Sequence, residues 1–305
     1  MHILFLFLDG VGLGVDDPTR NPFARAHMPT LTRLLGGRRL LAEAAPFSGP
    51  QADLLSLDAC LGVSGLPQSA TGQAVLLTGE NVPAALGYHY GPKPNPEVAR
   101  FLRDGGLFGR LAQAGKRVAL LNAYPPRYFS AIESGRRMYS AIPLALSQAG
   151  VPFFTDADLY AGRAISADFT GQGWHDHLNL SDAPVLAPEQ AGRRLAHLSA
   201  RFDFSFFEYW MSDYAGHGQD MPTALALLEQ FDAVLDGLCA EWDMSRDLLI
   251  LTSDHGNLED LSTRRHTDNP VPLLLAGNPA ARYAFTGLES ITGVAGKISQ
   301  LLRGY

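Results

Sequence analysis

Cysteine, basic runs and long apolar segments are all scarce in this sequence. Its 305 residues include two cysteines, Cys60 and Cys239, and no CxxC pair, which favours a reducing cytoplasm over a disulfide framework. The formal net charge is -7 and no basic run occurs, so we expect no nonspecific binding to nucleic acid. No stretch approaches the roughly 18 unbroken apolar residues of a membrane span, so we expect no membrane partner either.

The length and composition suit a large α/β protein. Hydrophobic residues make up 46% of the chain, enough to bury a sizeable core in one domain or in one domain with an insertion. The apolar run Ile3–Leu8 has no basic residue before it and no small-residue cleavage site after it, so it predicts a first strand and not a signal peptide. Strand-like runs then alternate with helical stretches, which predicts a parallel sheet between layers of helices.

The most informative stretch is Asp247–Asn257, with the sequence DLLILTSDHGN. Leu248–Leu251 form a continuous apolar run, as in strands that are buried on both faces of a parallel sheet. The run leads into Asp254 and His255, and the carboxyl end of a buried strand is where open α/β sheets bind their ligands. Both side chains bind borderline divalent metals, whereas a plain turn capped by Asp254 is the alternative.

Four further residues with the same chemistry follow strands or adjoin glycine or proline. Asp9 follows the first strand, and its GxGxG surroundings do not fit the GxGxxG turn that binds dinucleotides. Asp213 and His217 follow the aromatic strand Phe204–Trp210, and His266 precedes another apolar strand. Each residue alone has a turn or a cap as an equally good explanation. Their joint occurrence predicts a shared metal site.

Ser69, in the sequence QSATGQ, opens a predicted helix. A serine at this position is most often an N-cap. The functional alternative is a nucleophile whose developing anion faces the backbone N–H groups at a helix N-terminus.

The remaining elements are predicted from periodicity and from proline and glycine. We expect helices over 28–35, 107–114, 188–200, 221–242 and 291–302, and strands over 117–121 and 273–276. Residues 42–67 are expected to form a loop. Residues 123–185 are irregular apart from one possible helix over 141–149, and they are the candidate for a small insertion or partial cap. Residues 1–122 and 186–305 would then form the catalytic core. Trp174–His177, with the sequence WHDH, is expected in a solvated loop.

Taken in order, the motifs resemble those of the alkaline phosphatase superfamily, and within it the branch of cofactor-independent phosphoglycerate mutase and phosphopentomutase. The resemblance extends over nearly the whole chain. Asp9 matches the family's aspartate at the end of the first strand, and Ser69 matches its motif serine. Asp213 with His217 matches the Asp-x-x-x-His motif. Asp254–Asn257 matches Asp-His-Gly-Asn, and His266–Pro272 matches His-Thr-x-Asn-Pro-Val-Pro. The implied fold is an alkaline-phosphatase-like α/β sandwich, with a mainly parallel central sheet, helices on both faces and a small inserted cap.

The resemblance also implies a two-metal site. One divalent ion would be held by Asp213, His217 and His266. The other would be held by Asp9, Asp254 and His255, with the Ser69 oxygen as a further ligand. Hard phosphate oxygens and mixed aspartate and histidine ligands point to manganese or zinc. One cation would lower the pKa of the Ser69 hydroxyl so that it attacks phosphorus, and the other would neutralise phosphate oxygens.

Two departures from the mutase pattern bear on the reaction. Gln73 stands where the mutases have histidine. The mutases carry a large cap that excludes water, whereas only about 140 residues separate Ser69 from Asp213 by their numbers, and part of that span is expected in the core. A mutase must keep water from its phosphoenzyme. The sequence therefore favours a phosphomonoester hydrolase that works through a phosphoserine at Ser69. The alternatives are a phosphomutase, a phosphodiesterase or sulfatase, and a noncatalytic metal-binding relative; the substrate and the oligomeric state stay open.

Overall fold

The structure is a computed structural model that describes residues 1–303. At its centre lies a seven-stranded sheet with the order β2-β3-β9-β8-β1-β7-β4. These strands are β1 (Ile3–Leu8), β2 (Phe47–Ser48), β3 (Ala52–Leu57), β4 (Val118–Leu120), β7 (Phe204–Tyr209), β8 (Leu248–Thr252) and β9 (Val271–Gly277). A separate small sheet pairs β5 (Ala123–Tyr124) with β6 (Phe154–Thr155).

Five strands of the large sheet run in one direction. β1 is parallel to both of its neighbours, β7 and β8, and β4 is parallel to β7. β9 is antiparallel to β8 and to β3, so β3 runs with β1, while β2 returns against β3. The expected mainly parallel sheet is therefore confirmed. The antiparallel direction of β9 was not predicted, because an apolar run has the same composition whichever way the strand points.

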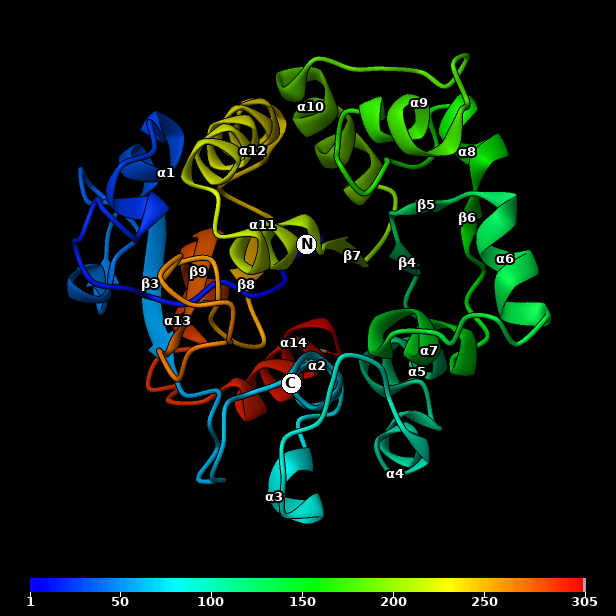
Figure 1. The fold of residues 1–305 in the computed structure, drawn as a ribbon, viewed down its shortest axis with the longest axis horizontal. Coiled ribbons are helices and arrows are strands. Elements are labelled where there is room, and N and C mark those ends of the chain that lie inside the picture. Colours follow the sequence, from blue (N-terminus) through cyan, green and yellow to red (C-terminus); the bar gives the residue numbers. More distant parts are fainter. Residues whose placement is uncertain (304–305) are drawn as a thin grey trace.

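Alternate residues of the central strands face two separate hydrophobic cores. In β1, the even-numbered residues from Leu4 to Leu8 pack into one core, and the odd-numbered residues from Ile3 to Phe7 pack into the other. Burying each such side chain stabilises the fold by about 1.5–3 kcal/mol. Figure 1 shows α1, α12 and α10 on one side of the strands and α14, α2, α5 and α7 on the other. Helices thus cover both faces of the sheet, as expected.

The helices that cover the first face are α1 (Pro29–Leu34), α10 (Pro188–Ser199) and α12 (Met221–Glu241). Those on the second face are α2 (Ser69–Thr78), α5 (Gly106–Gln113), α7 (Ala141–Gln148) and α14 (Val294–Arg303). The other α-helices of residues 1–303 are α3 (Val82–Leu86), α4 (Pro96–Ala99), α6 (Pro126–Glu133), α8 (Asp156–Tyr160), α9 (Gln172–Leu178), α11 (Met211–Gly218) and α13 (Pro279–Tyr283). Four 3-10 helices lie at Pro22–Ala24, Ala42–Ala44, Arg100–Leu102 and Ile291–Gly293. Among the described residues 1–303, no helix is both long and apolar enough to cross a membrane.

Two expected loops contain regular structure. Residues 42–67 include β2 and β3, which form one edge of the sheet. β3 was missed because it mixes apolar with polar residues, and because prolines and glycines flank it. Trp174–His177 is not a solvated loop, since it lies in α9 and the Trp174 side chain is 4% exposed.

The segment 123–185 is more regular than its composition indicates. It contains α6, α8, α9, the small sheet, and the helix expected over 141–149, which is α7. Ile142 and Leu146 of α7 pack into the core on the α2 side of the main sheet. The division of the chain into a core and an insertion at residues 123 and 185 stays a prediction.

The carboxyl ends of three central parallel strands meet at one edge of the sheet. In register, Leu8 at the end of β1 pairs with Tyr209 of β7, and Phe7 pairs with Thr252 of β8. The residues that follow these strands, Asp9 and Asp254 among them, therefore emerge side by side. This is the edge at which open α/β sheets bind ligands.

Candidate metal centre and nucleophile

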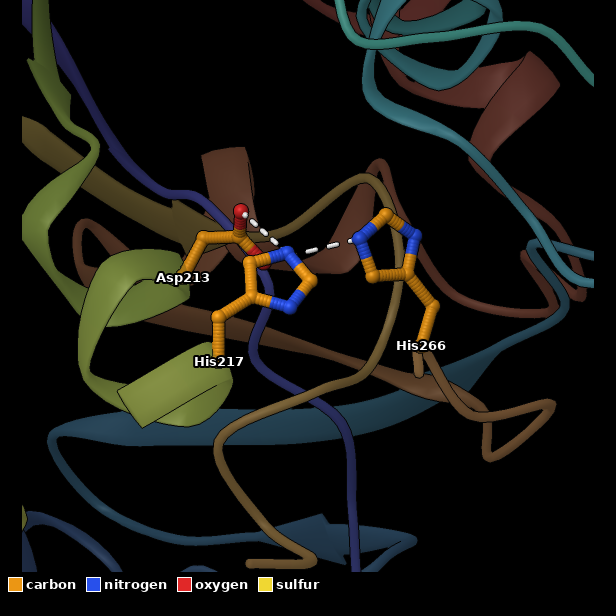
Figure 2. Close-up of side chains that lie close together, drawn as sticks. All are labelled: Asp213, His217 and His266. Carbon is orange, nitrogen blue, oxygen red and sulfur yellow. Dashed lines mark ion pairs between the residues drawn. The ribbon is translucent and has the colours of Figure 1, made fainter. Parts of the chain in front are cut away.

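Asp213, His217 and His266 converge above the carboxyl edge of the sheet (Figure 2). His217 Nε2 lies 3.2 Å from Asp213 Oδ2, and His266 Nε2 lies 3.7 Å from Asp213 Oδ1. Each residue offers one ligand atom, and these atoms lie within 4.8 Å of one another. A carboxylate and two imidazoles in this arrangement suit a borderline divalent cation.

Local structure fixes the orientation of these side chains. α11 begins directly after β7, and its helical spacing places Asp213 and His217 on one face, four residues apart. His217 Nδ1 lies 2.7 Å from the Arg264 carbonyl oxygen, and His266 Nδ1 lies 2.8 Å from the Pro67 carbonyl oxygen. Because a carbonyl oxygen only accepts, each Nδ1 donates, and each Nε2 keeps its lone pair for a ligand.

A second group consists of Asp9, Asp213 and His255, whose ligand atoms also lie within 4.8 Å of one another. His255 Nε2 lies 3.3 Å from Asp9 Oδ1 and 3.7 Å from Asp254 Oδ2. Asp254 was expected in this set and faces the same nitrogen, although it lies outside the tight group. The His255 and His266 rings stack with centroids 3.7 Å apart, so the two groups adjoin and share Asp213. That these residues bind metal stays a prediction.

Unsatisfied buried atoms show that this centre fits divalent cations. Asp254 and His255 are fully buried, and Asp9 is 8% exposed. Within the described part of the chain, Asp9 Oδ1 and Asp254 Oδ2 accept no hydrogen bond. The ion pairs of these two carboxylates within residues 1–303 are with His255 alone. Buried carboxylates without a cation cost several kcal/mol each, which bound divalent ions would offset.

The pKa shifts of Asp9, His255 and His266 also indicate that this centre suits a cation. Burial, with the nearby Asp254 carboxylate, raises the pKa of Asp9 to about 8. Burial opposes the charged form of His255, but the Asp254 and Asp9 carboxylates outweigh it and raise the pKa of His255 to about 10. Burial, followed by the neighbouring His255, lowers the pKa of His266 to about 4. Without metal, Asp9 and His255 together therefore favour holding a proton between them, which a bound cation would displace.

Ser69 faces this centre from the first turn of α2. Its Oγ lies 3.0 Å from His255 Nε2, and its side chain is buried. Gln68, not Ser69, occupies the N-cap position of α2, so the explanation of Ser69 as a helix cap is wrong. The helix supplies no acceptor for the N–H groups of Ser69 and Ala70, and the helix dipole favours negative charge at this end. The Thr71 hydroxyl instead donates to the backbone oxygen of Gln68 at 3.1 Å.

The rest of α2 packs tightly against the aspartates. A Cβ atom on Gly72 would lie 2.8 Å from the Asp254 carbonyl oxygen, so only glycine permits this approach. Gln73, which replaces the histidine of the mutases, donates from Nε2 to Asp9 Oδ2 at 3.4 Å. Gln73 thus holds the Asp9 carboxylate from the side of α2.

Glu259 joins three loops of the site, and the motif analysis missed it. Its side chain is 2% exposed, and its Oε2 accepts bonds from the backbone N–H groups of Gly12 and Asn257, both at 2.8 Å. Its Oε1 accepts from Asn269 Nδ2 at 3.0 Å and from the Thr267 hydroxyl. These donors belong to the loops after β1 and β8 and to the loop that carries His266.

We predict a large loss of stability for Glu259→Ala. The substitution leaves four donors without their acceptor, and buried unsatisfied groups cost about 1–3 kcal/mol each. The free energy of unfolding, measured with urea, should fall by at least about 3 kcal/mol. The control is Glu289→Ala, at an exposed residue, which should change it by less than about 0.5 kcal/mol. Equal values for the two variants would contradict the bridging function of Glu259.

Glu208 is a second buried carboxylate that the motifs did not identify. It lies in β7, is 6% exposed, and accepts from the Tyr124 hydroxyl at 3.4 Å. Burial, followed by the nearby Asp9 carboxylate, raises the pKa of Glu208 to about 8. The available signal was a charged residue inside an otherwise aromatic strand.

Comparison with known proteins shows similarity to one superfamily over part of the chain. Residues 188–302 match the model of the Metalloenzyme superfamily. The 2,3-bisphosphoglycerate-independent phosphoglycerate mutase of Ruegeria pomeroyi is 34% identical over 103 residues, which cover 32% of this chain. The same match covers 20% of that mutase, so the chain spans about a fifth of the length of this curated relative.

Two solved structures with a similar fold match this chain over its whole length. A protein from Pyrococcus horikoshii has a TM-score of 0.59 at 14% identity, and the match covers 100% of this chain and 97% of the other. Alkaline phosphatase from the Antarctic bacterium TAB5 has a TM-score of 0.56 at 12% identity, with 100% and 98% covered. At such identities these matches show the fold alone.

The chain is therefore similar to the Metalloenzyme superfamily over residues 188–302, and it shares its overall fold with alkaline phosphatase. The resemblance to that superfamily, and within it to the branch of cofactor-independent phosphoglycerate mutase, is confirmed.

Proposed function

We propose that this protein is a metal-dependent phosphomonoester hydrolase that works through a phosphoserine at Ser69. The observation that carries the proposal is the position of the Ser69 hydroxyl. Its Oγ lies 3.0 Å from His255 Nε2, beside buried carboxylates that have unsatisfied oxygen atoms. By contrast, the hydroxyl of Thr71, two residues on, donates to the backbone oxygen of Gln68.

The proposed metal sets are those implied by the resemblance. One ion would be held by Asp213, His217 and His266, and the Asp213 carboxylate also lies within reach of the Asp9 and His255 ligand atoms. The other would be held by Asp9, Asp254, His255 and the Ser69 oxygen. Two bound manganese or zinc ions would supply positive charge that lowers the pKa of the Ser69 hydroxyl and neutralises phosphoryl oxygens.

Residues of the chain orient the nucleophile and stabilise the charge that develops during the reaction. Burial of Ser69 and its contact with His255 fix the direction of Oγ, so that little rotational freedom is lost when a phosphate arrives. The N–H groups of Ser69 and Ala70, for which the helix supplies no acceptor, would favour the negative charge that develops on the phosphoryl oxygens. Attack by Oγ forms the Ser–O–P bond and expels the substrate alkoxide or phenoxide, which takes up a proton. Water then attacks the same phosphorus, releases phosphate and restores the serine hydroxyl.

Phosphomutase activity is the second candidate, because the curated relative is a phosphoglycerate mutase. Hydrolysis is favoured by the small amount of chain that could cover the centre. The span between Ser69 and Asp213 includes α2, α5, β4, α7, α10 and β7, all of which pack in the main core. Less of it is available to keep water from a phosphoserine.

Product analysis separates the two reactions. With phosphoglycerate or a phosphorylated sugar, we expect inorganic phosphate to form faster than any positional isomer. Phosphate release and isomer content can be followed in one sample by phosphorus NMR, with metal-free protein as the control. Isomer formation with negligible phosphate release would establish the mutase instead.

A further inference from the structure

Two exposed aromatic side chains adjoin the candidate metal centre. Trp210 is 39% exposed and Tyr214 is 71% exposed. Their rings are in edge-to-face contact, with centroids 5.1 Å apart. Single exposed aromatic residues are common on protein surfaces. A pair in mutual contact beside a candidate catalytic group is a different case, because it leaves a larger apolar area open to solvent there.

The helical geometry of α11 places this pair next to the metal ligands. Trp210 is the N-cap residue of α11 and already has helical backbone angles, φ -87° and ψ -8°. Trp210 and Tyr214 are four residues apart, as are Asp213 and His217, and each aromatic residue precedes one of those ligands by three positions. Residues three and four apart are neighbours on a helix surface. The aromatic pair therefore forms a strip directly beside the Asp213–His217 strip, while Ser212 and Ala215 face the core.

The most exposed ligand of the Asp213, His217 and His266 group is His217, three positions after Tyr214 on α11. The His217 side chain is 43% exposed, whereas those of Asp213 and His266 are 14% and 8% exposed. A phosphate bound at the centre must leave the remainder of its substrate on the solvent side, because the opposite side is filled by the buried Asp254 and His255. That remainder would pass the two rings. Aromatic rings there offer stacking and apolar contact, and they offer no charge.

We propose that Trp210 and Tyr214 form a stacking platform for the leaving group, which makes the substrate a phosphomonoester of a planar aromatic group. This inference rests on the proposed function. The proposed substrate class includes aryl phosphates and nucleoside phosphates, which both contain a flat aromatic ring. The kinetic experiment below distinguishes these two kinds of substrate.

Binding can be measured without turnover, because Trp210 is the exposed one of the three tryptophans. Trp174 and Trp242 are 4% and 7% exposed. We expect phenylphosphonate, which has no cleavable P–O–C ester bond, to quench the fluorescence of the metal-loaded protein in a saturable way. Methylphosphonate carries the same phosphonate group without a ring and should not do so. Tyr214→Ala should weaken phenylphosphonate binding by about 5- to 100-fold, the range for loss of one stacking ring. Tyr283→Ala removes a 77% exposed tyrosine elsewhere and is the matched control.

Kinetics provide the second arm. The ratio of kcat/KM for 4-nitrophenyl phosphate to that for glycerol phosphate should fall about tenfold or more in Trp210→Ala, and Trp210→Phe should restore most of it. A nucleoside monophosphate tested in parallel shows whether kcat/KM is higher for nucleoside phosphates or for aryl phosphates. An unchanged ratio in Trp210→Ala, or quenching that methylphosphonate reproduces, would overturn the platform. Saturable quenching by phenylphosphonate with no hydrolysis of any ester would instead uphold the platform and contradict the hydrolase.

Discussion

Ser69→Ala is expected to lower phosphatase turnover by more than about a thousandfold, because loss of a covalent nucleophile leaves only binding and electrostatic stabilisation. The fold should survive. The hydroxyl makes one side-chain contact, with His255, whose loss is expected to cost about 1 kcal/mol of stability. Most of the metal content should survive as well, since the other ligands remain. The measurements are kcat with a generic aryl phosphate, circular dichroism and elemental analysis on the same preparation.

Thr71→Ser is the matched control for this experiment. Thr71 lies two residues away in the same helix, and its hydroxyl is bonded to the backbone oxygens of Gln68 and Tyr90. Serine keeps that hydroxyl, so the variant should stay within about threefold of the parent, an effect of well under 1 kcal/mol. Near-normal turnover in Ser69→Ala would exclude Ser69 as the nucleophile.

Asp213→Ala is expected to have the largest effect on metal content. Asp213 is the residue that both candidate ligand groups contain, so its loss should weaken both sites. We expect the apparent metal affinity to fall by more than about 100-fold. Removing a residue that only orients a metal ligand typically costs about 10- to 100-fold, and loss of a ligand should cost more. Metal content after dialysis, measured by elemental analysis, should fall toward zero, and phosphatase activity should fall with it.

His217→Ala and Asp176→Ala are the controls that make this result specific. His217 belongs to one of the two groups and is more exposed, so its loss should remove one ion in preference to the other. Asp176 is an exposed aspartate in α9, outside both groups, and its loss should leave the metal content unchanged. Equal metal loss in His217→Ala and Asp213→Ala would argue against a shared carboxylate.

The sequence was sufficient to predict the parts of the site that follow apolar strands. β1 and β8 are continuous apolar runs, so their ends and the aspartates beyond them could be identified without a structure. Their parallel register then brings Asp9 and Asp254 together, as expected for a mainly parallel sheet. The five ordered motifs added His217 and His266, which strand periodicity alone could not place.

The supporting residues could not be predicted because their contacts depend on how loops meet. Glu259 lies in the loop after β8, where the sequence shows no helix or strand periodicity. Its carboxylate accepts a hydrogen bond from the backbone N–H of Gly12, which is distant in the sequence. The sharing of Asp213 between the two groups is likewise a property of the folded arrangement and not of residue spacing. β3 was missed for a related reason, since its pairing with β9 joins segments far apart in the sequence.

The most direct test of the proposed mechanism is to trap the phosphorylated protein. A labelled phosphomonoester is mixed with the metal-loaded protein, the reaction is quenched in acid within a turnover, and the labelled peptide is identified by mass spectrometry. The mechanism predicts label on Ser69 and none in Ser69→Ala. Label on Thr71 or on a histidine, or steady phosphate release with no labelled peptide at any quench time, would contradict it.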